Sequence, residues 1–233
     1  MKWIDAYKLH LIVVISACVL TGFSYWAWNF YAQKQNEQAE KDLYPFRSRL
    51  IEAEKKAGGE LFNSRSLFQD KKADFESIST EVEDYKSFLM SQTSVRPAHI
   101  ISAMELSSFL VRYEKKDQAL DLLDFVRMKS SSRSSWLYSV LLIQLGTLFM
   151  DKGDFTRAID LFTEVLSLKS AESFYQEVLL KTAVCYESIG ELDRASEIYT
   201  EIRQNKNAGL YKERALHYDR LFRLKQKLEK KPK

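Results

Sequence analysis

The stretch that decides the fold is LIQLGTLFMDKGDFTRAIDLFTEV, residues 142–165, because the chain repeats it in altered form as LLKTAVCYESIGELDRASEIYTEI, residues 179–202. The matched positions, all 37 residues apart, are Leu142 with Leu179, Gly146 with Ala183, Phe149 with Tyr186, Gly153 with Gly190, Ala158 with Ala195, and Phe162 with Tyr199. A weaker copy lies 39 residues earlier and carries Leu106, Leu110, Ala119, Leu123 and Val126. A period of this length predicts an all-α fold of stacked helical hairpins.

Each matched position suits one place in a helical hairpin. The small residues Gly146 and Ala183 allow the two helices of a hairpin to approach closely, and Ala158 and Ala195 mark where the second helix crosses the first. Large aromatic side chains are expected to fill the gap between successive hairpins, and these are Phe162 and Tyr199.

The turns inside the hairpins have their own signals. Gly153 and Gly190 are placed to end the first helix of a hairpin in a left-handed turn. Asp154 and Asp193 lie near the start of the next helix, where a carboxylate can cap free N–H groups.

The pattern resembles the tetratricopeptide repeat over about residues 100–206, and we assign three such repeats to residues 99–206. Two features depart from that family: a leucine stands where many such repeats have a large aromatic residue, at 142 and 179, and no proline closes either repeat. In proteins of this repeat type, the first helix of each hairpin lines a concave face that binds partners.

By this register, the concave face is mostly apolar and carries no lysine or arginine. Its residues are Ile101, Met104, Ser108 and Val111 in the first repeat, Val140, Ile143, Thr147 and Met150 in the second, and Glu177, Leu180, Val184 and Glu187 in the third. Such a face suits an amphipathic helix or an unfolded apolar segment, and methionines adapt to varied shapes. Alternatively, the chain's own terminal helix fills it.

An apolar segment near the N-terminus predicts a membrane anchor. After a short tail, residues 1–8, the 23 residues 9–31 carry no charge, and a helix needs about 20 to cross a bilayer. Trp26, Trp28 and Tyr31 close this segment with the aromatic rings that favour the membrane interface.

A competing signal lies inside the same segment. Residues 15–18, Ile-Ser-Ala-Cys, match a bacterial lipobox, which would place a lipid on Cys18 and remove everything before it. However, lipoproteins usually turn polar after that cysteine, whereas this chain stays apolar to Tyr31. We therefore expect a retained transmembrane helix.

Two further helical regions flank the repeats. Residues 32–98 are expected to form a membrane-proximal helical pair joined by a loop at 58–70, with Pro45 kinking or splitting the first helix and Pro97 opening the next one. Residues 207–233 are expected to form a capping helix and a basic tail. That tail is either a solvated helix end or a contact for anionic lipid or a partner.

The composition and motifs do not indicate catalysis, metal binding or nucleic-acid binding. A net charge of +3 over 233 residues does not suggest nucleic acid. The histidines His10, His99 and His217 have no metal-ligand spacing, and Cys185 falls between core positions, as a buried thiol would. Asp160 and Glu164 are interpreted as solvated charges. We expect no enzyme activity, no cofactor, no metal and no small-molecule substrate.

The whole arrangement resembles the YfgM family. The resemblance is carried by GFSYWAWNFY at 22–31, QKQNEQAEKDLY at 33–44 and AMELSSFLVRYEKKDQALDLLD at 103–124. It implies a bacterial inner-membrane protein with a single span, a periplasmic repeat domain and a role accessory to the Sec translocon. The implied partners are translocon subunits, a membrane-anchored chaperone or an exported polypeptide. The alternative is a repeat scaffold anchored by lipid at Cys18, acting in outer-membrane or cell-envelope assembly.

The two anchors differ in the mass of the mature chain. We expect the membrane-bound protein to keep residues 1–17, because the uncharged run continues past Cys18. Intact-mass measurement of protein extracted from membranes tests this, with Cys18→Ala as the control that blocks lipidation. A species that starts at a diacylated Cys18, and disappears in the control, would contradict the retained helix.

Overall fold

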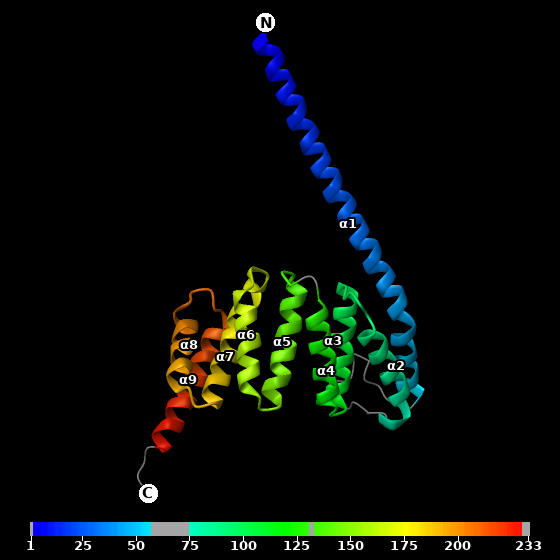
Figure 1. Ribbon diagram of the computed structural model, residues 1–233. Coiled ribbons are helices and arrows are strands. Elements are labelled where there is room, and N and C mark those ends of the chain that lie inside the picture. Colours follow the sequence, from blue (N-terminus) through cyan, green and yellow to red (C-terminus); the bar gives the residue numbers. More distant parts are fainter. Residues whose placement is uncertain (1, 57–74, 131–132, 230–233) are drawn as a thin grey trace.

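The computed structural model describes the backbone of residues 2–56, 75–130 and 133–229, and the side chains of 18–56, 75–130 and 133–224. Its described elements are helices α1 (Lys2–Lys56), α2 (Ser79–Met90), α3 (Pro97–Arg112), α4 (Lys116–Lys129), α5 (Trp136–Asp151), α6 (Phe155–Ser167), α7 (Tyr175–Ser188), α8 (Leu192–Gln204) and α9 (Leu210–Glu229), and short 3-10 helices η1 (Phe75–Ile78) and η2 (Lys169–Phe174). Figure 1 shows α2 to α9 side by side in one row, from which α1 projects.

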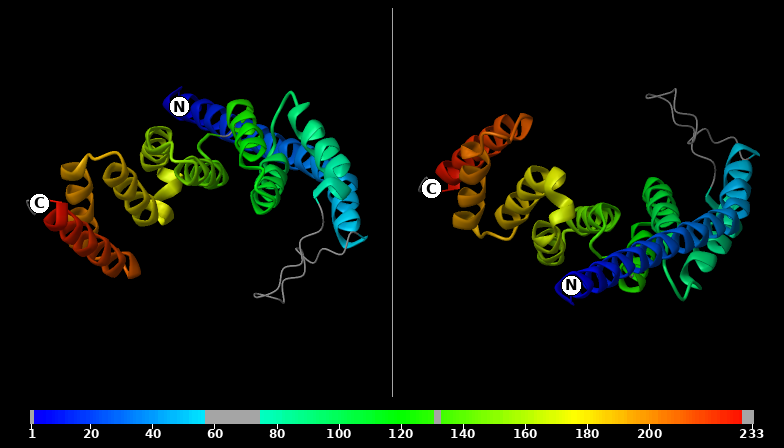
Figure 2. Two further views of the ribbon diagram at one scale, coloured as in Figure 1. Left: turned by 90° about the horizontal axis from the view of Figure 1, so that it is seen from below. Right: turned by 90° about the horizontal axis from the view of Figure 1, so that it is seen from above.

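Consecutive helices form the hairpins that the repeat predicts. Helix α3 packs on α4, α5 on α6, and α7 on α8, and α4 and α6 join each hairpin to the next. The first helices also touch one another in the order α3, α5, α7, α9. The result is an all-α, tetratricopeptide-like solenoid, whose curvature is visible along its axis in Figure 2.

The two helices of the second hairpin approach closely at Gly146. A Cβ atom added there would lie 2.6 Å from Cε1 of Phe162, so only glycine leaves room for that ring. We expected Phe162 to fill the gap between hairpins, but its fully buried ring lies against Gly146 of its own hairpin. Tyr199 does face outward from its hairpin, against Tyr218 and Phe222 of α9.

The hairpin turns follow one backbone pattern, but not always with glycine. Gly153 and Gly190 have φ angles of 81° and 84°, in the left-handed region that glycine tolerates. At the corresponding place in the first hairpin stands Glu114, with φ of 63°. Its amide still donates to the carbonyl of Val111 at 3.0 Å, so the turn forms without the favoured residue.

Helix capping follows the sequence expectation at one of two sites. The Asp154 carboxylate accepts a hydrogen bond from the Arg157 amide at 3.2 Å and caps α6. Asp193 makes no cap, because α8 begins one residue before it and the capping position falls to Glu191, whose side chain makes no cap bond. The Asp193 charge still lies in the first turn, where the helix dipole favours it.

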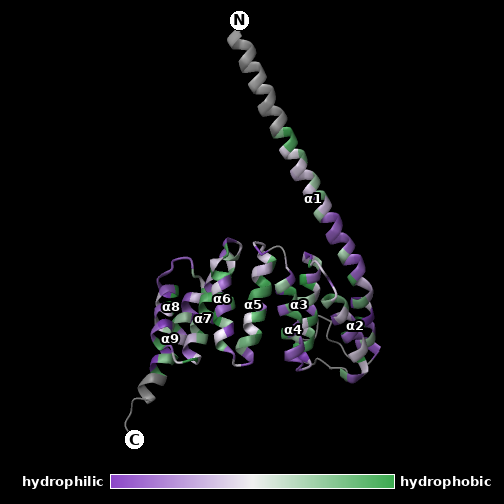
Figure 3. Ribbon diagram, in the orientation of Figure 1, coloured by the Kyte–Doolittle hydropathy of each residue, from purple (hydrophilic) through white to green (hydrophobic). Residues whose placement is uncertain are grey.

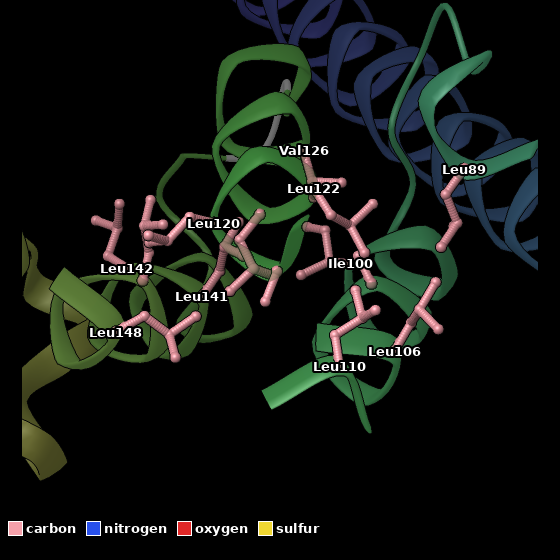
Figure 4. Packing of buried hydrophobic residues seen from close by; sticks show 14 of the residues in the cluster. Leu89, Ile100, Leu106, Leu110, Leu120, Leu122, Val126, Leu141, Leu142 and Leu148 are labelled. Atoms are coloured by element: carbon pink, nitrogen blue, oxygen red, sulfur yellow. The ribbon is translucent and has the colours of Figure 1, made fainter. Parts of the chain in front are cut away.

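A continuous apolar core runs through the first two hairpins. Side chains from α3, α4 and α5 point toward one another in Figure 4, where Ile100 and Leu110 face Leu122 of α4, and Leu120 of the same helix faces Leu141. A second cluster joins α7 and α8 to α9. Asp219 of α9 is buried and pairs with Arg203 of α8 at 2.9 Å, which ties the capping helix to the last hairpin.

Helix α1 is one unbroken helix of 55 residues. We expected Pro45 to kink or split it, and expected the membrane segment and the next helix to be separate. Instead the helix passes through Pro45 and curves around the domain (Figure 2). Contacts with the domain compensate for the backbone hydrogen bond that a proline inside a helix cannot make. Leu43 and Leu50, on either side of Pro45, are buried in the core with α2 and α3.

The anchor region is only partly described. In the part of the chain whose side chains are described, no helix is both long and apolar enough to cross a membrane. The expected segment, residues 9–31, begins outside that part. From Val19 to Tyr31 the large apolar side chains are strongly exposed, and Figure 3 shows hydrophobic residues there giving way to hydrophilic ones before the domain. The expected loop at 58–70 also lies outside the described residues.

We expect Gly146→Leu to prevent the native packing of α5 on α6. Overpacking a core typically costs about 1–3 kcal/mol, and here the added side chain meets an aromatic ring that is itself fully buried. Thermal unfolding followed by circular dichroism tests this, with Thr147→Leu at the neighbouring half-buried position as the matched control. Equal melting temperatures for the two variants would contradict the close approach.

Candidate partner-binding face

The candidate face is built from the row of first helices, α3, α5 and α7. The Gln144 side chain of α5 donates to the Met104 carbonyl and to the Ser108 hydroxyl of α3, both at 3.1 Å. This pair of bonds sets α5 beside α3 on that side of the stack. Gln144 was not among the residues expected at the face, because a glutamine on a helix surface looks like any solvated residue.

The structure places the expected residues in three environments. Ile101 is exposed over 44% of its surface, and Ser108 is exposed as well. Half-buried positions are Met104, Val111, Val140, Ile143, Met150 and Val184. Leu180 is buried, which differs from the expected open groove. The face is therefore partly open over the first two repeats.

Helix α9 explains why the third repeat differs. It packs against α7, and Leu180 belongs to the same buried cluster as Ala208 and Ala215. The pKa of Tyr211 on α9 is raised by burial and by the neighbouring Glu177, one of the residues expected on the face. The terminal helix thus covers the end of the face at α7 and leaves α3 and α5 to a partner.

A second concavity lies between the outer helices α4 and α6, above α5. This pocket of about 220 Å³ is lined by Asp124, Arg127, Phe149, Arg157, Asp160, Leu161 and Glu164. We expected Asp160 and Glu164 to be solvated. Asp160 is exposed, but Glu164 is half-buried, accepts a hydrogen bond from the Tyr138 hydroxyl at 2.8 Å and lies 3.6 Å from Arg127. Burial and that carboxylate raise the pKa of Tyr138 to about 12. Glu164 of α6 thus links that helix to Tyr138 of α5 and to Arg127 of α4.

Among the described histidines and cysteines, His99 and Cys185 are buried, whereas His217 and Cys18 are exposed. At the start of α3, Nδ1 of His99 accepts a hydrogen bond from the Arg96 amide at 3.0 Å. Burial lowers the pKa of His99. His217 is exposed on α9, and the side chain of His10 is not described. Within the described residues, no cluster of His, Cys, Asp and Glu side chains has a metal-ligand arrangement. Cys185 is fully buried.

Comparison with known proteins identifies the repeats. Residues 141–174 and residues 177–205 each match a model of the tetratricopeptide repeat. These two segments are therefore tetratricopeptide repeats, which makes the chain a scaffold for protein–protein interaction. No curated protein matches the chain.

Two solved structures of MamA are similar in arrangement. One shares 18% sequence identity, with a TM-score of 0.42, over 66% of this chain and 91% of that chain. The other shares 17% identity, with a TM-score of 0.42, over 69% of this chain and 88% of that chain. At these scores, neither likeness bears on the function.

We expect Cys185 to resist alkylation in the folded protein. Burial raises the pKa of its thiol from 9.0 to about 11, so at pH 8 it holds roughly a hundredfold less reactive thiolate than an ordinary cysteine. Because the folded state keeps this proton more tightly, its contribution to stability is present below about pH 9 and is lost as pH rises toward 11.

Iodoacetamide labelling followed by mass spectrometry measures this reactivity. The background is Cys18→Ser, and the matched control adds Ser188→Cys to Cys185→Ala, which puts an exposed thiol on the same helix. Labelling of Cys185 as fast as the control, without denaturant, would contradict its burial.

Proposed function

We propose that the chain is an adaptor anchored in the bacterial inner membrane by residues 9–31, with its repeat domain in the periplasm beside the Sec translocon. Its partners would be translocon subunits, a membrane-anchored chaperone or an exported polypeptide. We assign it no catalytic activity and no cofactor.

The observation that carries this proposal is the half-open apolar face on α3 and α5. Ile101 is exposed and Val140 and Ile143 are half-buried, so each keeps surface that can contact a partner, and Ile143 also packs on the buried core. Apolar positions repeated along parallel helices suit a partner helix or an extended apolar segment. Both kinds of segment occur on membrane proteins and on polypeptides that are being exported.

The anchor is supported by the continuity of α1 and by its aromatic side chains. Trp26, Trp28 and Tyr31 are each more than half exposed, and Trp26 lies on the opposite side of the helix from Trp28 and Tyr31, so one packed neighbour could not cover them all. A bilayer interface surrounds a helix completely and favours such rings. The helix then enters the domain without a flexible joint.

We expect a photo-crosslinker at Ile101 to capture a translocon subunit in intact inner membranes. The matched control is the same crosslinker at Thr163, which is exposed on α6 on the outer side of the stack. Equal yields from both positions, or capture of unrelated proteins only, would oppose the proposed role.

A pair of substitutions tests whether the face itself binds. Ile101→Asp with Val140→Asp should keep the fold, because both side chains reach solvent, and should lower capture from a crosslinker at Val111 by about tenfold or more. The matched control is Thr156→Asp with Thr163→Asp, which adds the same two negative charges at exposed positions of α6. Unchanged capture by a folded double variant would mean that the partner binds elsewhere.

A further inference from the structure

The connections of the solenoid gather on two opposite edges. Loops between hairpins form the connector edge, which consists of residues 91–96, 130, 133–135, 168–174 and 205–209. Turns inside hairpins form the turn edge, residues 113–115, 152–154 and 189–191. Val95 and Ser130 of adjacent connectors pair directly in a short backbone bridge. Figure 1 shows the connector edge on the side where α1 leaves the domain, and the C-terminal end of α9 on the turn edge.

The connector edge lies close to the height of the proposed membrane surface. The Asn36 side chain of α1 accepts the amide of Ala98, in the first turn of α3, at 2.9 Å, which fixes α1 against this edge. At 1.5 Å per residue, Tyr31 is about 8 Å and Trp28 about 12 Å further along the helix. Those rings would mark the headgroup level. Helix α1 also leans over the solenoid rather than away from it (Figures 1 and 2).

The charges of the two edges differ in sign and in pairing. Each connector holds one basic residue, and these are Arg96, Arg133, Lys169 and Lys206, against a single acidic residue, Glu172. None of these four cations has an ion-pair partner in the described part of the chain. On the turn edge two basic residues stand against three acidic ones, and Lys152 and Glu191 are already paired, with Asp117 and Arg194.

Large apolar side chains accompany the free cations. Trp136 opens α5 at the connector edge and is 62% exposed, and Leu210 opens α9 there and is 58% exposed. Met128, one residue before the end of α4, is 59% exposed. Exposed tryptophan and leucine among basic residues are typical of surfaces that lie in a lipid interface. Near the turn edge the exposed large apolar residues are Ile189 and, in the C-terminal part of α9, Leu221 and Leu224, and none of them is a tryptophan.

We infer that the connector edge rests on the surface of an anionic phospholipid bilayer, with its cations on the headgroups and Trp136 and Leu210 dipping between them. This inference rests on the proposed membrane anchor. Unpaired cations within about one Debye length of an anionic surface are attracted to it. The basic C-terminal tail begins on the opposite edge, so the contact falls to the connectors instead.

The contact can be measured as energy transfer from the domain to the bilayer. The full chain, with Cys18→Ser and Ser134→Cys, carries a donor dye on the connector edge and is reconstituted into vesicles with acceptor-labelled headgroups. The vesicles contain phosphatidylcholine alone or mixed with phosphatidylglycerol. The matched position on the other edge is Ser188→Cys, and the buried Cys185 stays unlabelled under native conditions.

We expect higher transfer from position 134 in the anionic vesicles, lost at high salt, and no such change from position 188. Each basic residue near an anionic surface adds roughly fivefold to the population in contact. Arg133→Glu with Lys169→Glu and Lys206→Glu should therefore abolish the increase. Lys116→Glu with Lys152→Glu and Arg194→Glu makes the same change of charge near the turn edge and should preserve it.

The outcomes separate the two proposals. If the chain does not float with vesicles of either composition, the anchor itself is wrong and the proposed function falls with it. If the chain floats but transfer from position 134 is the same in both lipids, or is insensitive to salt, the anchor stands and the lipid contact is wrong. The salt dependence of transfer from position 134 is measured without any charge-reversal variant. It therefore tests the lipid contact even if such a variant fails to fold.

Discussion

The contact between the Phe162 ring and the backbone of Gly146 sets the geometry on which the other features depend. It brings α6 against α5 at a distance that no larger residue at 146 would permit. A hairpin closed in this way presents one flat apolar side to the hairpin before it and another to the hairpin after it. The stack and its two edges follow from repeating hairpins of this kind, in which Ser107 and Ala183 take the place of Gly146.

The ends of the stack are finished differently, and this decides which surfaces stay open. At the C-terminal end, α9 covers α7 and is tied down by buried Asp219. At the N-terminal end, α1 and α2 cover α3, with Leu43 and Leu50 supplying the apolar contact. Between these covers, the first helices of the first two repeats keep their half-open row, which is the surface available to a partner.

Much of the fold could be predicted from the sequence, because matching positions in successive repeats need the same kind of residue. Gly153 and Gly190 have the left-handed conformation that their pattern predicts, and Asp154 caps its helix. The failures arose where a local signal met a tertiary contact. Pro45 does not end α1 because the domain holds both sides of it, and Glu114 forms a glycine-type turn because the flanking helices are already packed.

The surfaces were harder to predict than the helices. The sequence register put Leu180 on an open groove, but burial of that residue depends on where α9 docks, which no local pattern records. The connector edge escaped notice for a related reason. Its four cations are spread from residue 96 to residue 206, and only the alternating direction of the helices brings them to one side.

The unbroken passage of α1 from its aromatic segment into the domain has a consequence for how the chain can change in length. Between Tyr31 and Asn36 the helix is continuous, so every residue gained or lost there would turn the whole domain by about 100° around the helix axis and shift it by about 1.5 Å. Only changes of about seven residues, two full turns, would restore the facing of the solenoid, and they would displace it by about 10 Å. The number of residues between Tyr31 and Asn36 therefore sets the rotation of the domain about the helix axis as well as its distance from the aromatic segment. Protein engineering could change that number to rotate the repeats.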